Sequence, residues 1–260
     1  MFCSNCGKEL EAGDLFCGYC GGDRRTVGAE SCHLVLVEGG SFQVEGQSVA
    51  VGSFLMGQYP ITQEEWQSVM GINPSAWKGS HLPVESITWY EAVEFCNELS
   101  LQQGLAPCYT DNGEIISCDW SANGYRLPTE LEWEYAARGG VHQSHYQYSG
   151  SDDIDEVAWH EGNSDGRTHA VGGKKPNALG LYDMSGNVRE WCWNWYDDGY
   201  GGSSASINPP DATSCYSEGR YFRGGSWNDS ASACTVAVRN NFLAYYAYPY
   251  VGLRVVRLCR

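Results

Sequence analysis

One helix-start signal occurs three times in this 260-residue chain and then gives way to a long stretch without regular patterning. Residues 62–65, 88–91 and 129–132 each read Thr-x-x-Glu. In such a capping box the Thr oxygen accepts a hydrogen bond from a free amide of the first turn, and the Glu carboxylate accepts one from the Thr amide. We therefore expect three helices that begin at these sites. The second should run to about Ser100 and the third should end at Gly139-Gly140, where glycine permits a left-handed turn.

Strand signals are few, and much of the chain is irregular. Two β-rich runs, residues 32–37 and 48–56, flank a Gly-Gly pair and predict paired strands. From Gly140 to Tyr221 the residues Gly, Asn, Asp and Trp dominate, as is typical of loops. Because 42% of the residues are hydrophobic and 13% are aromatic, the chain can still bury a sizeable core. The pattern indicates a loop-rich α+β domain with a small N-terminal appendage.

Four cysteines near the N-terminus, Cys3, Cys6, Cys17 and Cys20, form two Cys-x2-Cys pairs that are each followed by glycine. Four thiolates at this spacing suit a tetrahedral structural zinc. A segment this short has too little core to fold alone, so zinc binding would supply its folding free energy. Two local disulfides or a redox pair are the alternatives.

The predicted layout is a zinc ribbon over residues 1–24, a linker over 25–33 and the main domain over 34–260. The formal net charge of −16 opposes contact with phosphate backbones, so no nucleic-acid partner is expected. No run of 18 apolar residues and no N-terminal signal sequence stand out, so we expect neither a membrane span nor an export signal. As written, the chain is expected to be cytoplasmic, with export by another route left open. The oligomeric state is not predicted.

Four phrases of the main domain carry a family resemblance. They are residues 127–140 (LPTELEWEYAARGG), 180–191 (GLYDMSGNVREW), 223–227 (RGGSW) and 252–254 (GLR). In content and order they resemble the signature phrases of the formylglycine-generating enzyme (sulfatase-modifying factor) superfamily. The resemblance covers nearly all of positions 34–257. It implies a C-type-lectin-like fold with a small antiparallel sheet, two or three helices and much irregular loop.

The resemblance also implies where an active site would lie. In the enzymes of this superfamily two cysteines after the Gly-Gly-Ser phrase bind copper(I), a soft ion that prefers thiolates. Here Asp229 occupies the first of those positions, and only Cys234 falls near the second. One thiolate cannot form the two-coordinate site, so we expect no copper and no catalytic residues. The alternatives are a copper-dependent oxidase in which Cys234 has an unconventional partner, and a related nonheme-iron enzyme, which would need a His-rich helical domain.

One metal site of the superfamily matches residues of this chain. The resemblance implies that the carboxylates of Asp183 and Glu190 join the backbone carbonyls of Gly186 and Val188 around calcium, a hard cation that prefers oxygen ligands. In the alternative, Asp183 caps a turn and Glu190 pairs with an arginine. Arg189 stands where the family usually has Trp. The sequence therefore leaves open whether the chain binds calcium in addition to zinc.

Residues 228–250 lie between two of the family phrases and have an unusual composition. The segment contains no Lys, Glu, Gln, Met or Trp, the five types that codons ending in a pyrimidine cannot encode. An Asn codon rewritten at its two adenines keeps its final pyrimidine and could not produce these five. Tyr interspersed with Ser, Ala and Asn is also typical of binding loops, in which Tyr supplies rigid contact area. An aromatic loop that packs on its own scaffold is the alternative.

A second group of proteins with this fold, the variable proteins of diversity-generating retroelements, matches this behaviour. In them a window after Arg-Gly-Gly-Ser-Trp is rewritten at adenine positions of a template. The resemblance implies that scaffold residues alternate with diversified residues that bind a protein or glycan ligand. The expected scaffold residues are Trp227, Cys234, Arg239, Gly252 and Arg254. The expected ligand-contacting residues are Asp229, Ser230, Ser232, Ala233, Val238, Phe242, Ala244, Tyr245, Tyr246, Ala247 and Tyr248.

Three hypotheses for function follow. The first is a non-catalytic ligand-binding protein, in which Tyr245, Tyr246 and Tyr248 would be the main anchors because aromatic side chains dominate interface energetics. The second is the copper or nonheme-iron enzyme. The third is an intracellular interaction domain that uses the zinc ribbon as an adaptor.

Overall fold

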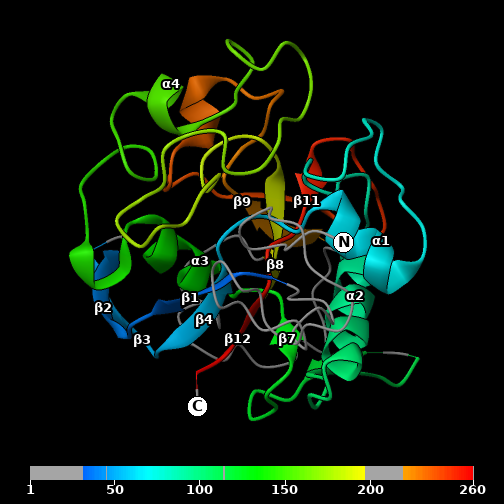
Figure 1. Cartoon of the computed structure of the whole chain (residues 1–260). Helices are drawn as coiled ribbons and strands as arrows, with labels where there is room; N and C mark the ends of the chain where they lie inside the picture. The colour runs from blue at the N-terminus through cyan, green and yellow to red at the C-terminus, as the bar shows by residue number, and fades with distance from the viewer. Residues whose placement is uncertain (1–31, 45, 114, 197–218, 260) are drawn as a thin grey trace, which may run out of the picture. The chain divides into compact units, whose positions relative to one another are not determined.

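Figure 1 shows the course of the chain in a computed structural model. The residues that the structure describes are 32–44, 46–113, 115–196 and 219–259. The chain divides into two compact units, residues 1–33 and 34–260. The four cysteines predicted to bind zinc, and most of the predicted linker, lie outside the described residues. All described helices and strands belong to the second unit.

The three main helices begin where the capping boxes predict. They are α1 (Gln63–Met70), α2 (Trp89–Gln102) and α3 (Glu130–Ala137). At each start the side chain of Thr62, Thr88 or Thr129 accepts from the amide of the Glu three residues on, and that Glu accepts from the Thr amide. α3 is followed by Gly139 in the left-handed conformation, with φ 94°. The helix predictions are confirmed because a capping box is a local signal that needs no distant partner.

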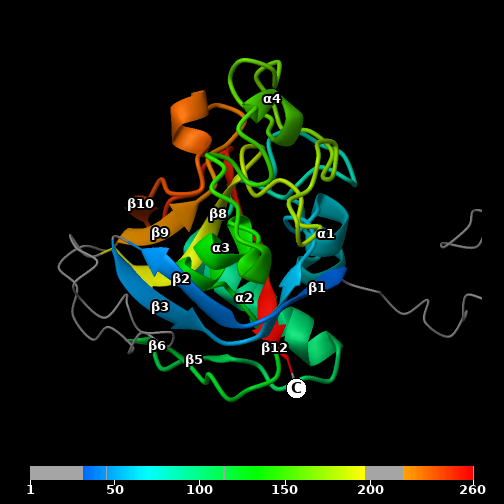
Figure 2. The ribbon, with the colours of Figure 1, turned by 90° about the vertical axis from the view of Figure 1, so that its left-hand side faces the viewer.

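Two four-stranded sheets form the frame of this unit (Figure 2). The first, in the order β1-β4-β12-β7, consists of β1 (Leu34–Val37), β4 (Phe54–Gly57), β12 (Val256–Leu258) and β7 (Tyr125–Arg126). The second, in the order β10-β9-β8-β11, consists of β10 (Asn240–Leu243), β9 (Gly219–Arg223), β8 (Arg189–Trp195) and β11 (Val251–Gly252). Two separate hairpins pair β2 (Gly40–Val44) with β3 (Gln47–Val51) and β5 (Tyr109–Asp111) with β6 (Ile116–Cys118). Neighbouring strands are antiparallel except β11, which lies parallel to β8.

The predicted pairing of the two N-terminal runs is confirmed, since β1 pairs with β4, but the prediction for the second run needs a correction. The run over residues 48–56 does not form one strand, because it breaks at Gly52-Ser53 into β3 and β4. β1 pairs with β4, and the two strands that lie between them along the chain, β2 and β3, pair with each other. The other side of β4 is taken by β12 from the C-terminal end of the chain, with Val256 opposite Met56. Such a long-range partner leaves no local sign in the sequence.

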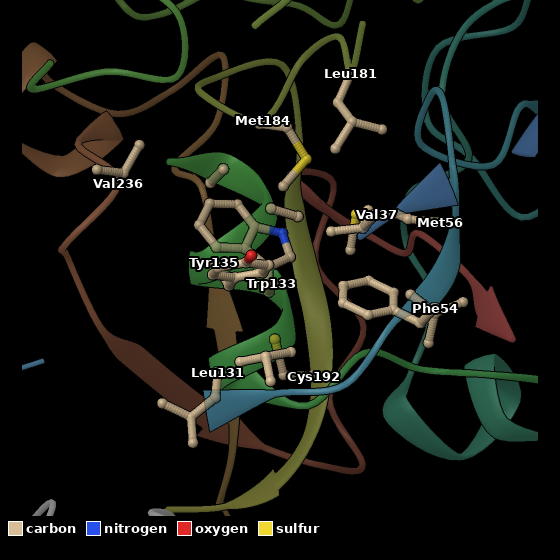
Figure 3. Packing of buried hydrophobic residues seen from close by; sticks show 14 of the residues in the cluster. Val37, Phe54, Met56, Leu131, Trp133, Tyr135, Leu181, Met184, Cys192 and Val236 are labelled. Carbon is tan, nitrogen blue, oxygen red and sulfur yellow. The ribbon is translucent and has the colours of Figure 1, made fainter. Parts of the chain in front are cut away.

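α3 lies at the centre of the core and is buried all round (Figure 3). Its Leu131, Trp133 and Tyr135 pack in one cluster with Phe54 of β4 and Cys192 of β8. A helix without an exposed face lacks the one-sided apolar stripe of a surface helix. The burial of α3 therefore depends on satisfying its polar residues as well.

Three glutamates of α3 are buried, and each pairs with an arginine. Glu132 forms a bidentate pair with Arg126 at 2.7 and 2.6 Å. Glu130 and Glu134 both contact Arg223, at 3.0 and 2.6 Å. Breaking one buried pair typically costs about 3 to 5 kcal/mol, because the remaining charge has no partner. These pairs hold α3 against β7 and β9 in one defined position.

The stretch from η2 (Gly140–His142) to the start of β8 is mostly irregular, as predicted, with one short helix, α4 (Ile154–Val157). A second 3-10 helix, η4 (Ala231–Cys234), lies near α4 in both views (Figures 1 and 2). Tyr148, Val157, Ala158 and the buried Cys234 form a small core between them. This packing ties the beginning of the segment 228–250 to the irregular loops.

Candidate ligand-binding surface

The segment 228–250, called the window below, crosses the edge of the second sheet. It leaves the sheet after β9, forms η4, returns as β10 beside β9, and ends next to β11. The amide of Ser86 donates to the carbonyl of Tyr248, and the amide of Trp89 donates to that of Ala244, both at 3.0 Å. These two bonds and the pairing of β10 with β9 fix the second half of the window, and the amide of Glu161, which donates to the carbonyl of Asp229 at 3.0 Å, fixes its start.

The expected scaffold residues at the start of the window are held by the surrounding structure. Trp227 donates from Nε1 to the carbonyl of Pro249 at 2.9 Å and packs edge-on against Trp77, with ring centroids 4.8 Å apart. Cys234 is fully buried. Neither side chain can be exchanged freely without disturbing its neighbours.

The remaining expected scaffold residues are also anchored. Arg239 forms a bidentate pair with Glu130 of α3 at 2.6 and 2.7 Å. A Cβ atom at Gly252 would lie 2.3 Å from the carbonyl oxygen of Val84, so only glycine fits there. Arg254 has no exposed side-chain surface and pairs with Glu190 at 2.7 Å. All five expected scaffold residues therefore have a structural role.

Most of the expected ligand-contacting residues face solvent wholly or in part. Five are exposed: Ser230, Ser232, Tyr245, Tyr246 and Ala247. Five are partly buried: Asp229, Ala233, Val238, Phe242 and Tyr248. Ala244 requires a correction, because its side chain is completely buried beside the start of α2 and cannot contact a ligand.

Five aromatic side chains of the window form a contacting layer, here called the tyrosine patch: Phe242, Tyr245, Tyr246, Tyr248 and Tyr250. Centroid distances are 4.7 Å for Tyr245–Tyr246, 6.0 Å for Tyr246–Tyr248 and 5.3 Å for Tyr248–Tyr250. Phe242 lies 4.4 Å from Tyr248. Tyr245 and Tyr246 are each 48% exposed, so the outer part of the patch is open to a partner. Tyr250 was not among the predicted ligand-contacting residues.

An ion pair lies beneath the tyrosine patch. Arg189, the first residue of β8, donates from Nε to Oδ2 of Asp229 at 2.8 Å and from Nη2 to Oδ1. Ser226 Oγ donates to the same carboxylate at 2.7 Å. The guanidinium lies over the rings of Phe222 and Tyr250, 4.8 Å from each centroid. The two departures from the family pattern, Arg189 for Trp and Asp229 for Cys, thus contact each other. Their joint occurrence is the one sequence signal that could have identified Arg189 as a residue of this surface.

The residues at the expected copper position do not fit copper(I). Burial and, next, the charge of Asp229 raise the pKa of the Cys234 thiol to about 12, so the sulfur is protonated at neutral pH. Copper(I) needs thiolates, and the position of the other cysteine is occupied by the carboxylate paired with Arg189.

The expected calcium ligands do not fit calcium in this arrangement either. Both carboxylate oxygens of Glu190 contact Arg254, and Trp133 Nε1 donates to Oε2 at 2.7 Å. Asp183 accepts from the amide of Gly172 at 2.7 Å. The charge of Glu190 is already neutralised by Arg254, so this carboxylate binds a cation poorly. Desolvation raises the pKa of Asp183 to about 6, which disfavours its charged form.

The backbone positions of that expected site, Gly186 and Val188, lie in the same buried turn. Among the described residues no group of three or more His, Cys, Asp or Glu could hold a metal ion. Glu190 instead pairs with an arginine, as in the alternative, and Asp183 accepts from Gly172, eleven residues earlier in the chain. None of the described helices has both the length and the apolar content to cross a bilayer.

Comparison with known families agrees with this architecture. Residues 23–259 match the sulfatase-modifying factor enzyme 1-like domain, and residues 2–23 match a zinc-ribbon domain. The chain therefore belongs to the formylglycine-generating enzyme (sulfatase-modifying factor) superfamily and has its α+β, C-type-lectin-like fold, as predicted.

Three relatives illustrate the range of the family. The chain is 40% identical over 261 residues to the chaperone protein LppX of Paenibacillus barcinonensis, which covers 86% of this chain and 89% of that protein. It superposes on the solved structure of Treponema denticola variable protein 1 with a TM-score of 0.78 and 33% identity, covering 87% of this chain and 95% of that one. The formylglycine-generating enzyme of Streptomyces coelicolor is 34% identical over 134 residues, only 45% of this chain and 42% of the enzyme.

Proposed function

We propose that this chain is a non-catalytic ligand-binding protein whose window, residues 228–250, displays diversified side chains on a rigid C-type-lectin-like scaffold. One observation carries the proposal: the window divides into anchored and open positions. Within it Cys234 is buried and Arg239 is bonded to Glu130, and the scaffold residues that flank it are anchored too, whereas Ser230, Ser232, Tyr245, Tyr246 and Ala247 are exposed. Such a division lets the exposed set change without loss of the fold.

The similarity to Treponema denticola variable protein 1 supports the proposal, since that protein is named for variability and shares this fold at 33% identity. The absence of a fitting copper pair at Asp229 and Cys234 agrees with loss of oxidase chemistry. Binding then depends on shape and surface chemistry, not on a reactive group.

The tyrosine patch favours a protein over a glycan as the ligand. The window contains no Lys or Glu, and its two charged side chains, Asp229 and Arg239, are both neutralised by partners. Protein interfaces are enriched in aromatic residues and depleted in Lys and Glu at their centres. Tyr245 and Tyr246 would be the principal contacts, each about 2 kcal/mol if they are hot spots.

Two observations test the proposal. A near-copy of the DNA that encodes residues 223–257, differing only at adenines, should lie near the gene together with a reverse transcriptase. In addition, libraries that vary the five exposed positions should fold with unchanged cooperativity and yield binders to an arbitrary test protein such as lysozyme. The proposal is wrong if no template copy exists and most library members unfold.

The relation to the chaperone protein LppX supports a second candidate, chaperone-like binding of a client protein through the same patch. Here the surface would be constant rather than diversified. Suppression of the thermal aggregation of citrate synthase, lost in a Tyr245→Ser, Tyr246→Ser variant, would favour this function. No suppression at a tenfold molar excess would exclude it.

We further propose that residues 1–24 form the zinc ribbon, with Cys3, Cys6, Cys17 and Cys20 as tetrahedral ligands, ahead of a linker over 25–33 and the domain over 34–260. The match of residues 2–23 to a zinc-ribbon domain supports this layout. With all four positions filled by protein, zinc there would be structural.

A further inference from the structure

We propose that Arg189 forms the floor of a carboxylate-binding subsite under the tyrosine patch, and that Asp229 now fills this subsite in place of an acidic side chain of a protein ligand. The inference rests on the proposed function, because Asp229 is one of the positions expected to vary. It names a chemical group that the surface can recognise and the residue that decides whether it does.

The geometry of Asp229 shows that the subsite is built for a carboxylate. Arg189 presents Nε and Nη2 side by side, and the two carboxylate oxygens of Asp229 accept from them as a planar fork. Ser226 Oγ, which belongs to the RGGSW phrase, adds a third donor at 2.7 Å. All three donors come from residues outside the window.

The guanidinium would remain in place if the Asp229 side chain were absent. The rings of Phe222 and Tyr250 lie 4.8 Å from it, and the ring of Phe242 lies at 5.5 Å. The amide of Arg189 also donates to the carbonyl of Tyr250 at 2.9 Å. Aromatic faces stabilise a cation and limit its motion, so the donors are organised before a ligand arrives.

Access to the subsite depends on the residue at position 229. The side chains of Arg189 and Asp229 are 15% and 12% exposed, so the pair lies just below the surface. A small residue at 229 would leave a gap lined by Arg189 and Ser226 that opens toward the patch. Aspartate closes the gap and cancels the charge, so the present chain offers a neutral floor to its partner.

Position 229 therefore acts as the specificity-determining residue for acidic ligands. An Asn codon becomes an Asp codon by one change at its first adenine, and it becomes Ser, Ala or Gly codons by other changes at its adenines. Rewriting of this single codon would switch Arg189 between neutralised and available. The chain's net charge of −16 opposes anions at long range, but salt screens that repulsion beyond about 8 Å.

The test is chemical rescue of Asp229→Ala by formate, a carboxylate small enough to enter the gap. Thermal unfolding is followed with sodium formate or sodium chloride at equal ionic strength. We expect the melting temperature of Asp229→Ala to rise saturably with formate and not with chloride, with an apparent dissociation constant no tighter than about 1 mM for so small a ligand. The wild-type protein should not respond.

The control is the double variant Arg189→Gln, Asp229→Ala, which lacks the fork and should not respond to formate. If Asp229→Ala does not fold, Asp229→Ser is used in the same titration. Equal effects of formate and chloride, or an equal response of the double variant, would overturn the subsite. Because no natural ligand is needed, such a failure would leave the diversified window untouched, which the template copy tests separately.

Discussion

The buried pair between Arg254 and Glu190 allows a demanding test of the fold. Arg254 donates from Nε and Nη2 to Glu190, from Nη1 to the carbonyl of Gly57 at 2.8 Å, and from Nη2 to the carbonyl of Tyr182 at 2.6 Å. Both charged side chains have no exposed surface. One guanidinium thus joins β4, the loop before β8, and β8 itself.

We expect Arg254→Gln to lower the free energy of unfolding by about 4 to 6 kcal/mol. Loss of one member of a buried ion pair costs about 3 to 5 kcal/mol, and a backbone carbonyl left without a donor costs about 1 kcal/mol or more. For a domain of this size such a loss corresponds to a fall in melting temperature of roughly 10 to 20 °C. Urea unfolding followed by tryptophan fluorescence measures the difference.

Arg257→Gln is the matched control, since it makes the same chemical change three residues on in β12. Its guanidinium lies over the ring of Tyr125 at 5.6 Å and forms no ion pair with a described residue. We expect a loss of about 1 kcal/mol or less. A second check is Arg254→Gln with Glu190→Gln, which removes the stranded charge and should recover part of the loss. Equal stability of Arg254→Gln and Arg257→Gln would refute the reasoning.

Three further predictions concern the window. Tyr246→Ala should change the free energy of unfolding by less than about 0.5 kcal/mol, since the ring is 48% exposed, yet weaken binding of a selected ligand by about 2 kcal/mol in a calorimetric titration; a large loss of stability would show that the ring is part of the core. The Cys234 thiol should resist iodoacetamide at pH 8 in the folded protein, because burial raises its pKa to about 12. A thiol whose pKa is higher in the folded state adds stability below its unfolded pKa and loses it as pH rises toward 12, so Cys234→Ala should show a shallower loss of stability above pH 9 than the wild type. Rapid alkylation of Cys234, measured by mass spectrometry of the peptide that contains it, would contradict the alkylation prediction.

Local signals predicted the helices, and family phrases predicted the fold, but neither could predict long-range contacts. Each capping box, at Thr62, Thr88 and Thr129, depends on four consecutive residues, so the start of each helix could be predicted from the sequence. The insertion of β12 between β4 and β7 depends on residues about 200 and 130 positions away along the chain, and no local pattern records it.

The site shows the same division. Exposure of Tyr245 and Tyr246 agrees with the expectation from composition, because a Tyr-rich polar loop has few ways to bury itself. Burial of Ala244 and the contact between Arg189 and Asp229 depend on how β10 and β8 meet neighbouring elements. A resemblance identified the departures at these positions but not that they compensate each other.

The ion pair between Arg239 of the window and Glu130 of α3 has a consequence for the gene. If adenines in this segment are rewritten, a residue that must stay constant needs a codon without adenine. Trp, Cys, Gly and Arg all have such codons, and these are the residue types at Trp227, Cys234, Arg239 and Gly252. For arginine the choice matters, since three of its six codons contain adenine. We expect Arg239 to be encoded by CGT, CGC or CGG, so that a contact within the folded protein determines synonymous codon usage in its DNA.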